Sequence, residues 1–370
     1  MRYYIIAGEA SGDLHGSNLI KAIKAKDPNA IIQCWGGDLM QAAGGKLVKH
    51  YRSLAFMGFV EVLMNLRTIL SNIKFCKQDI ANFKPDVLVC VDYPGFNLRI
   101  AKWAKTKGLK VIYFIAPQVW AWKENRVPQM RQSIDRLLCI LPFEKQYFKD
   151  RWNWEVDYVG HPLMQVLADQ KNLAHPIPQI EGKKIIALLP GSRKQEILKK
   201  LPIMLSVADA FPDDHFAIAQ APGLDDEWFS SLVPKTKNIH IVKANTYALL
   251  NHSKAALVTS GTATLETALL GVPEIVCYKG NPITLAIAKR FVKIKFIALV
   301  NLIMNKEVVK ELIQEELTTA NLIEALKDLL ENPAKQAQIK EDYAALQKAL
   351  YTGQNAAEVS AGIILEELSN

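Results

Sequence analysis

The chain has 370 residues, more than one hydrophobic core usually organises, so we expect two domains. Half of its residues are hydrophobic and 22% are charged, with 19 Gly and 17 Pro, which excludes collagen-like, disordered and low-complexity chains. The 45 basic and 37 acidic side chains give a net charge of +8, which favours an anionic partner: nucleic acid, anionic lipid or a phosphorylated ligand.

The start of the chain indicates a protein that is not exported. Met1-Arg2 leads directly into an apolar run, without the longer apolar core and cleavage site of a secretory signal. The longest apolar stretches, such as 87–91 and 296–300, are far shorter than the roughly 18–20 residues of a membrane-spanning helix. The five cysteines lack the close pairs of zinc sites and disulfide frameworks. We therefore expect a cytoplasmic protein with buried thiols, no metal site and no cofactor.

Short, nearly continuous apolar runs alternate with segments of helical period, as expected for parallel sheets covered on both faces. The first series of predicted strands is Tyr3–Ala7, Ile31–Trp35, Val87–Val91, Val111–Ile115 and Leu137–Leu141. The second series is Ile185–Leu189, His215–Ala219, Ile239–Val242, Ala256–Thr259, Glu274–Cys277 and Phe296–Leu299. The pattern predicts an α/β protein with two sheets.

Two prolines in 174–178 predict a linker between the two series. We expect an N-terminal domain over 1–165 and a C-terminal domain over 180–340. The chain is helical after Pro333, and the segment 341–370 is predicted to return to the first domain.

The first strand ends in a loop, 8–16, that contains three glycines. The spacing G-x-G-x-x-G is absent, which disfavours a dinucleotide site. One interpretation is a tight turn in which Asp13 or Ser11 caps the following helix. The other places Glu9 and Ser11 at the lip of a substrate cleft, because the carboxyl ends of parallel strands face the ligand in such folds.

Two further candidates follow the next strands. Asp92 ends the strand 87–91 and is either a catalytic carboxylate or a cap for the helix near Asn97. Gln118, Trp120 and Trp122 follow the strand 111–115. Their indole rings suit a sugar or an acyl chain, or they fill the core between the domains.

The second half contains two loops that suit phosphate groups. Gly191, Ser192 and Arg193 precede a helix, where exposed N–H groups, the helix dipole and a guanidinium favour an anion. Ser192 acting only as a helix cap would leave Arg193 unexplained.

The other loop contains small and hydroxyl-bearing residues before a helix, and Glu266 follows one turn later, where its carboxylate suits two ribose hydroxyls. Together the loops predict a nucleoside diphosphate pocket. The loop residues are Ser260, Gly261, Thr262, Ala263 and Thr264.

The segment 56–70 is richer in Met and large apolar residues than one buried stripe needs. It is either a core helix or an interfacial helix that dips into a bilayer surface. The residues predicted to face the membrane are Phe56, Met57, Phe59, Val62, Leu63 and Leu66.

Six blocks together resemble the lipid-A-disaccharide synthase family, glycosyltransferase family 19, over nearly the whole chain. They are GEASGD (8–13), PQVWAW (117–122), LPFE (141–144), YVGHPL (158–163), LPGSR (189–193) and SGTATLE (260–266). The resemblance implies the GT-B fold, with two Rossmann-like domains facing across a cleft. It also implies an inverting, metal-independent transfer that joins UDP-2,3-diacylglucosamine to the 6-hydroxyl of 2,3-diacylglucosamine 1-phosphate. The products would be the β-1,6-linked disaccharide 1-phosphate and UDP.

The resemblance also implies roles for single residues. Asp92 is the first choice for the base and Glu9 the reserve. The loops at 191–193 and 260–264 would hold the diphosphate, Glu266 the ribose, and Asn301 would lie near the donor. Ser11, Gln118 and Trp120 would line the substrate cleft. Family members often carry a second acid where this chain has Gly95, so no role for that acid applies here.

The expected partners are the two acylated sugars and the cytoplasmic face of the inner membrane, where the protein would associate peripherally. A homodimer is an open option. Two rival functions remain. A UDP-N-acetylglucosamine 2-epimerase-like enzyme would use a cleft histidine such as His161, whereas a nucleic-acid binder would need a basic run interleaved with exposed aromatics, which is absent from the sequence.

Overall fold

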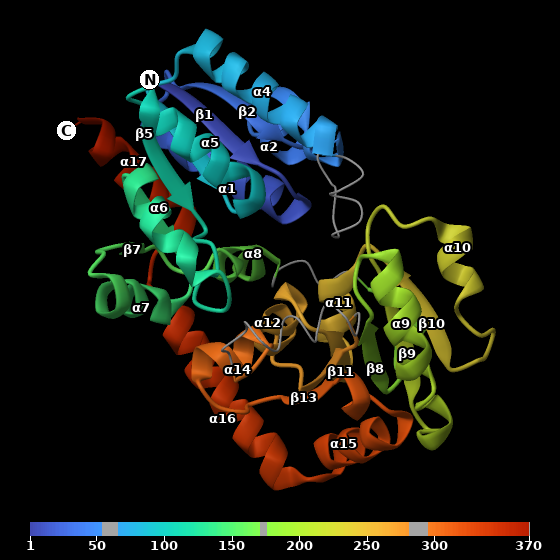
Figure 1. The fold of residues 1–370 in the computed structure, drawn as a ribbon. Coiled ribbons are helices and arrows are strands. Elements are labelled where there is room, and N and C mark those ends of the chain that lie inside the picture. The colour runs from blue at the N-terminus through green and yellow to red at the C-terminus, as the bar shows by residue number, and fades with distance from the viewer. Residues whose placement is uncertain (54–65, 171–175, 281–294, 370) are drawn as a thin grey trace. The chain divides into compact units, whose positions relative to one another are not determined.

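The computed structural model describes residues 1–53, 66–170, 176–280 and 295–369, and the chain forms two compact units (Figure 1). Unit 1 contains Met1–Pro162 and Leu350–Asn370, and unit 2 contains Leu163–Ala349. The chain thus leaves unit 1 once and returns to it at its end.

Unit 1 is built on a seven-stranded parallel sheet with the strand order β3-β2-β1-β4-β5-β6-β7. Its strands are β1 (Arg2–Ala7), β2 (Ile31–Gly36), β3 (Lys46–His50), β4 (Val87–Val91), β5 (Lys110–Phe114), β6 (Arg136–Cys139) and β7 (Asp157–Tyr158). Its helices are α1 (Ala10–Lys26), α2 (Asp38–Ala42), α4 (Leu66–Phe83), α5 (Pro94–Thr106), α6 (Val127–Ser133), α7 (Pro142–Trp152) and α17 (Ala356–Ser369), with short 3-10 helices η1 (Tyr51–Ser53) and η2 (Glu124–Arg126).

Helices cover both faces of this sheet, and strand β4 shows why its sequence is continuously apolar. Val87, Val89 and Val91 belong to the core beneath α1 and α17, whereas Leu88 and Cys90 belong to the core beneath α4 to α7. Successive side chains of a strand point to opposite faces, so a strand covered on both sides needs apolar residues at every position.

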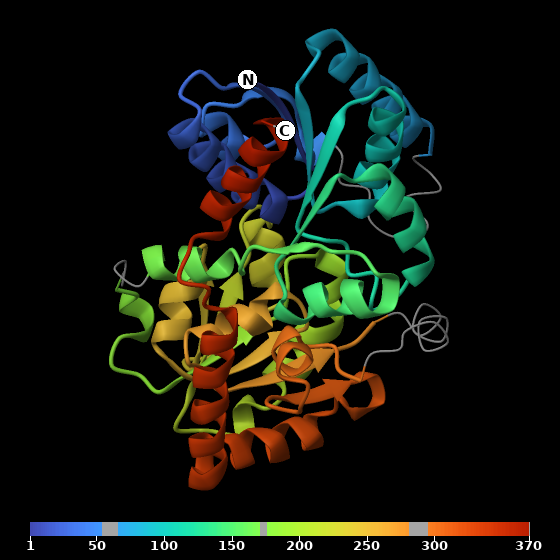
Figure 2. The same ribbon diagram turned by 90° about the vertical axis from the view of Figure 1, so that its left-hand side faces the viewer.

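The C-terminal helix α17 packs against α1, as predicted (Figure 2). Ala361 and Ile364 of α17 are fully buried in the core that α1 also lines. Glu367 forms ion pairs with Lys110 at 2.7 Å and with Arg136 at 3.8 Å, which join the end of α17 to β5 and β6.

Unit 2 is built on a six-stranded parallel sheet with the order β10-β9-β8-β11-β12-β13. Its strands are β8 (Ile185–Leu189), β9 (His215–Gln220), β10 (Ile239–Lys243), β11 (Ser253–Thr259), β12 (Glu274–Tyr278) and β13 (Lys310–Ile313). Its helices are α8 (Leu163–Gln170), α9 (Lys194–Leu205), α10 (Asp226–Ser231), α11 (Thr246–Asn251), α12 (Thr262–Leu269), α14 (Leu299–Met304), α15 (Thr319–Glu331) and α16 (Pro333–Leu350), with 3-10 helices η3 (Pro178–Ile180), η4 (Ala208–Ala210) and η5 (Gln314–Glu316).

The structure confirms two parallel sheets but corrects the last predicted strand. Residues Phe296–Leu299 are not a strand, because Leu299 begins helix α14. The backbone N–H groups of Ile297 and Ala298 donate to the carboxylate of Glu311 at 3.0 Å each. Glu311 lies in β13, which pairs with β12 at the edge of the sheet.

Three strands were not predicted. β3 and β13 carry charged residues, and β7 has only two residues, so none of them has the continuous apolar pattern of the others. None of the helices in the described ranges has the length and apolar composition needed to cross a lipid bilayer.

Candidate functional site

The backbone is strained where strands β4 and β5 of unit 1 end. Asp92 and Tyr93 have φ values of 44° and 50°, and Ile115 has φ 67°. Left-handed conformations are uncommon for residues other than glycine, and for a β-branched residue they are outliers. Because β4 and β5 are neighbours, the three strained residues lie at one edge of the sheet. Strain of this kind concentrates at functional sites.

Buried polar groups hold the Asp92 backbone in this conformation. The Asp92 carbonyl accepts hydrogen bonds from Asn97 Nδ2 at 2.7 Å and from the Tyr113 hydroxyl at 2.6 Å. Helix α5 begins at Pro94, with no side-chain cap from Tyr93. The predicted alternative, in which Asp92 caps the helix near Asn97, is therefore wrong: Asn97 instead supports the turn that presents Asp92.

The surroundings of Asp92 raise the pKa of its carboxyl group toward neutral pH. Burial and the negative charge of Glu9 raise the pKa of Asp92 to about 6, against a hydrogen bond from the Tyr93 backbone. A carboxylate with this pKa is ionised at neutral pH and is still a stronger base than an ordinary aspartate. The structure thus brings the two predicted base candidates into electrostatic contact.

The glycine loop after β1 packs closely against Tyr93. A Cβ atom on Gly8 would lie 2.2 Å from a Tyr93 ring carbon, so only glycine fits beneath this ring. Ser11 is exposed in the first turn of α1, and Glu9 is the residue that precedes the helix. Gly8 therefore has a packing role that supports the turn at Asp92.

Asp13 has a partner that its sequence position did not reveal. Its carboxylate accepts from the backbone N–H groups of Gly37 at 2.7 Å and of Met40 at 3.0 Å. It therefore caps α2, and the prediction that Asp13 caps its own helix is wrong. The reason is that the parallel pairing of β1 and β2 brings the start of α2 next to α1.

The segment after β5 is anchored by a buried acid. Trp120 Nε1 donates to Glu144 Oε1 at 3.0 Å, and the Trp120 ring lies edge-on to Phe143 at 4.9 Å. Gln118 is exposed, and Trp122 is 51% exposed with the Lys123 ammonium 3.8 Å from its ring centroid. The PQVWAW and LPFE motifs thus form one structural unit that presents Gln118 and Trp122 to solvent.

The two loops of unit 2 line one cavity of about 400 Å³. The loops follow β8 and β11, which are adjacent strands, so their carboxyl ends meet at one edge of the sheet. The predicted residues that line the cavity are Gly191, Ser192, Arg193, Ser260, Gly261, Thr262, Ala263 and Glu266.

The first loop turns at Gly191, whose φ of 109° favours glycine. Arg193 is the residue before α9, and its guanidinium lies 3.2 Å from Glu196 Oε1. The other Glu196 oxygen is 3.7 Å from Lys200 Nζ, which is 2% exposed, and burial lowers the pKa of Lys200 despite this pairing. Among the described residues that line this cavity, Arg193 carries the positive charge.

Glu266 lies on the side of the cavity formed by α12. Its Oε1 accepts from the Tyr247 hydroxyl at 2.9 Å, and burial raises the pKa of Glu266. The hydroxyl oxygen of Thr259, which also lines the cavity, is buried and has no hydrogen-bond partner within the described residues. Both side chains therefore offer polar atoms to a ligand.

Two predicted donor-site residues do not line this cavity. Thr264 is fully buried, and its hydroxyl donates to the Gly261 carbonyl at 2.9 Å. Asn301 is also fully buried; its Nδ2 donates to Val309 O and Glu311 Oε1 at 2.8 Å each, and its Oδ1 accepts from Val308 N at 2.8 Å. Their side chains shape the neighbouring backbone.

The remaining predicted residues are those expected to face the membrane, in 56–66, and His161. Phe56, Met57, Phe59, Val62 and Leu63 lie outside the described residues, and Leu66 begins α4. His161 is 5% exposed, and burial together with His15 lowers its pKa to about 3, so its imidazole is neutral.

Thr246 and Tyr247 were missed by sequence reasoning. Thr246 lines the unit 2 cavity, and Tyr247 contacts Glu266 from the same helix, α11. That helix follows Ala244, whose φ is 48°, so no glycine marks the turn in the sequence. The signal in the sequence was a hydroxyl residue, Thr246, shortly after the end of strand β10.

Comparisons with known proteins agree with this architecture. The glycotransferase of kitacinnamycin has a TM-score of 0.66 and 14% identity, with 99% of each chain covered. A UDP-GlcNAc 2-epimerase from Neisseria meningitidis, solved with UDP-GlcNAc, has a TM-score of 0.65 and 16% identity, with 100% of each chain covered. At these identities the likeness shows the fold, which is GT-B-like as predicted.

Sequence similarity is more specific. The family model described as LpxB, lipid-A-disaccharide synthetase, matches residues 3–364. The lipid-A-disaccharide synthase of Geobacter metallireducens is 34% identical over 375 residues, which cover 99% of this chain and 97% of that protein. The chain therefore belongs to the lipid-A-disaccharide synthase family, glycosyltransferases of lipid A biosynthesis.

Proposed function

We propose that this enzyme transfers 2,3-diacylglucosamine from UDP to the 6-hydroxyl of 2,3-diacylglucosamine 1-phosphate, with inversion at the anomeric carbon. The observation that carries the proposal is the cavity in unit 2, where two strand-end loops, one guanidinium and the Glu266 carboxylate meet. We assign the donor to unit 2 and the acceptor to unit 1, in line with the domains predicted over 180–340 and 1–165.

In unit 2, the pyrophosphate of the donor would lie against Gly191, Ser192 and Arg193, with 260–263 on its other side. N–H groups at the start of α9 and α12 and the Arg193 guanidinium suit the charge that develops on departing UDP. Thr264 and Asn301 would act indirectly, by holding the backbone that surrounds the donor. Glu266, which Tyr247 orients, would accept hydrogen bonds from the ribose hydroxyls.

In unit 1, Asp92 would act as the general base. Its carboxylate takes the proton of the acceptor 6-hydroxyl as that oxygen attacks the anomeric carbon of the donor. The new C–O bond forms as the bond from the anomeric carbon to the UDP oxygen breaks, and UDP leaves with that electron pair. One displacement inverts the carbon. Glu9 would keep the pKa of Asp92 high, and it is the alternative base.

The substrates carry acyl chains, so we propose that the enzyme works peripherally at the cytoplasmic face of the inner membrane. The apolar segment 56–70 is the proposed contact with lipid, and the net charge of +8 favours anionic headgroups. A homodimer stays a proposal that the molar mass in solution would test.

Incubation of the purified chain with both acylated substrates tests this function. Product formation, followed by mass spectrometry and UDP release, is expected with and without EDTA, because Arg193 and backbone N–H groups supply the positive charge. UDP release that stops in EDTA would contradict the metal-independent mechanism. Conversion of UDP-N-acetylglucosamine to its 2-epimer, without disaccharide, would favour the epimerase instead.

A further inference from the structure

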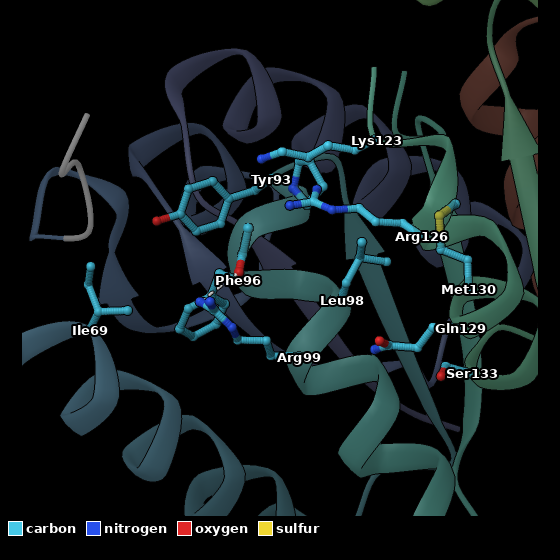
Figure 3. Close-up of a pocket in the computed structure, with 12 residues that line it drawn as sticks. Ile69, Tyr93, Phe96, Leu98, Arg99, Lys123, Arg126, Gln129, Met130 and Ser133 are labelled. Carbon is cyan, nitrogen blue, oxygen red and sulfur yellow. Dashed lines mark hydrogen bonds between the residues drawn. The ribbon is translucent and has the colours of Figure 1, made fainter. Parts of the chain in front are cut away.

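Unit 1 contains a second cavity, of about 450 Å³, which the sequence did not predict. It lies between the turn after β4, helix α5 and the segment that leads into α6 (Figure 3). Tyr93, the residue after Asp92, forms part of its wall. The cavity is thus next to the proposed base along the chain.

Three cations line this cavity, and no carboxylate is among its lining residues. Arg99 comes from α5, Arg126 from η2, and Lys123 from the residue before η2. Figure 3 shows the side chains of Lys123 and Arg126 extending toward Tyr93. Burial and the charge of Arg126 lower the pKa of Lys123, and burial and the charge of Arg99 lower that of Arg126. The cations therefore repel one another, a cost that a bound anion would remove.

These cations are not neutralised within the described part of the chain, where none of the three has a carboxylate at ion-pair distance. Arg99 Nη1 donates to the Gly95 carbonyl at 3.1 Å, and the Lys123 ammonium lies over the Trp122 ring. Glu124, their neighbour in sequence, accepts instead from Tyr147 and from Arg151, at 2.9 Å each. The positive charge is thus available to a ligand.

Much of the remaining cavity wall is apolar. Ile69 of α4, Phe96 and Leu98 of α5 and Met130 of α6 line it, together with the polar side chains of Gln129 and Ser133. The first turn of α5, which also lines the cavity, adds the positive end of a helix dipole. A small anion attached to an apolar group satisfies both parts of this lining, whereas a free inorganic ion would use only the cations.

We propose that this cavity binds the phosphate monoester of the acceptor, with the start of an acyl chain against its apolar wall. The inference rests on the proposed function, because that function defines the acceptor as an acylated sugar phosphate. Binding here would hold the acceptor against the turn that presents Asp92. Anionic lipid headgroups share this chemistry, so the test has to separate the two sources.

The first test compares acceptors with and without the phosphate. In Arg126→Gln and Arg99→Gln, we expect the KM for the phosphorylated acceptor to rise about tenfold to a hundredfold. The KM for the dephosphorylated acceptor and the KM for the donor should stay within about twofold. Lys102→Gln is the matched control, because Lys102 is an exposed cation on α5 that does not line the cavity, and we expect wild-type constants.

Gln129 permits a second test without loss of a cation. It is an exposed residue of α6 that lines the cavity. The nearly isosteric Gln129→Glu would place a carboxylate among the cations and should raise the KM for the phosphorylated acceptor, whereas Gln129→Ala should raise it much less.

Three outcomes would overturn the inference and leave the proposed function intact. They are equal losses on both acceptors, equal effects of Gln129→Glu and Gln129→Ala, and variants that bind phosphatidylglycerol vesicles less but keep the preference for the phosphorylated acceptor. The last outcome would assign the cavity to membrane headgroups. If the wild-type protein forms no disaccharide at all, the proposed function itself fails.

Discussion

The indole N–H of Trp120 donates to the buried carboxylate of Glu144, across 24 residues of sequence. The same carboxylate accepts from the backbone N–H groups of Ile140 at 3.2 Å and Leu141 at 3.0 Å. Glu144 is 1% exposed, and its burial raises its pKa to about 7. One acid therefore fixes both the start of α7 and the segment that follows β5.

This arrangement predicts that Glu144→Gln destabilises the protein. Glutamine has one acceptor oxygen and would direct an amide N–H at another donor, so we expect the free energy of unfolding to fall by about 1–3 kcal/mol. Urea denaturation followed by tryptophan fluorescence measures the change. Glu155→Gln is the control, since Glu155 is exposed and pairs with exposed Lys149, a contact worth about 0.5 kcal/mol. Equal effects of the two substitutions would contradict the role of Glu144.

Asp92→Asn should separate transfer from donor binding. Loss of the base is expected to lower kcat about a hundred- to ten-thousandfold, while UDP affinity stays unchanged. Because the pKa of Asp92 is raised in the folded protein, its ionised form costs stability at neutral pH. The free energy of unfolding of the Asn variant should therefore be higher by about 1 kcal/mol, which urea denaturation measures. Normal turnover by this variant would remove Asp92 from the mechanism.

The pH dependence distinguishes the two candidate bases. With Asp92 as the base, kcat/KM should fall as the pH drops below about 6, where its carboxylate becomes protonated. The negative charge of Glu9 raises this pKa, so Glu9→Gln should move the acidic limb to lower pH and keep substantial turnover. Loss of nearly all turnover in Glu9→Gln, together with loss of the acidic limb in the residual activity, would instead identify Glu9 as the base.

Arg193→Ala should weaken UDP binding, measured by isothermal titration calorimetry, by about tenfold or more. Lys194→Ala removes the same charge from the next position, where the ammonium lies over the Trp228 ring and does not line the cavity. We expect little change for this control. Equal losses from both substitutions would indicate a general charge effect rather than a phosphate contact.

Glu266→Ala should remove discrimination at the ribose. The wild-type protein is expected to bind UDP about tenfold to a hundredfold more tightly than 2′-deoxy-UDP. The reason is that 2′-deoxy-UDP lacks the hydroxyl that would donate a hydrogen bond to the Glu266 carboxylate. The variant should bind the two nucleotides alike. Retained discrimination in Glu266→Ala would assign the ribose to another group, and Tyr247, its hydrogen-bond partner, would be the first to test.

Gly8→Ala should impair unit 1 through Tyr93. Its methyl group would overlap the ring, so Tyr93 and the adjacent Asp92 must shift; we expect lower kcat, a stability loss of about 1–3 kcal/mol and unchanged UDP affinity. Gly362→Ala is the control, because that helical position in α17 is open and alanine favours the helix. Full activity in Gly8→Ala would show that the turn tolerates displacement.

Strands were predictable from the sequence where burial on both faces of the sheet required an apolar residue at every position. Strands such as β4 and β8 are apolar at every position because both faces are covered. Strand β13, Lys-Glu-Leu-Ile, was not predictable from its polar sequence. Its Glu311 accepts hydrogen bonds from the backbone of Ile297 and Ala298, which directly precede helix α14, so the apolar run 296–299 does not form a strand.

The site was predictable in part for a similar reason. Glycine and hydroxyl residues at strand ends marked the unit 2 loops, because those residue types are needed locally. Tyr247 and the cationic cavity depend on contacts between segments distant in sequence, which no local pattern records. The same holds for Asn301, whose amide is used entirely inside the fold.

The return of α17 to unit 1 has a consequence for folding. This helix supplies Ala361 and Ile364 to the core that α1 lines, so that side of the unit 1 core is complete only after the residues of unit 2 have been added to the chain. A truncated variant that ends before α17 would expose the apolar side chains that this helix covers, and exposed apolar surface favours aggregation.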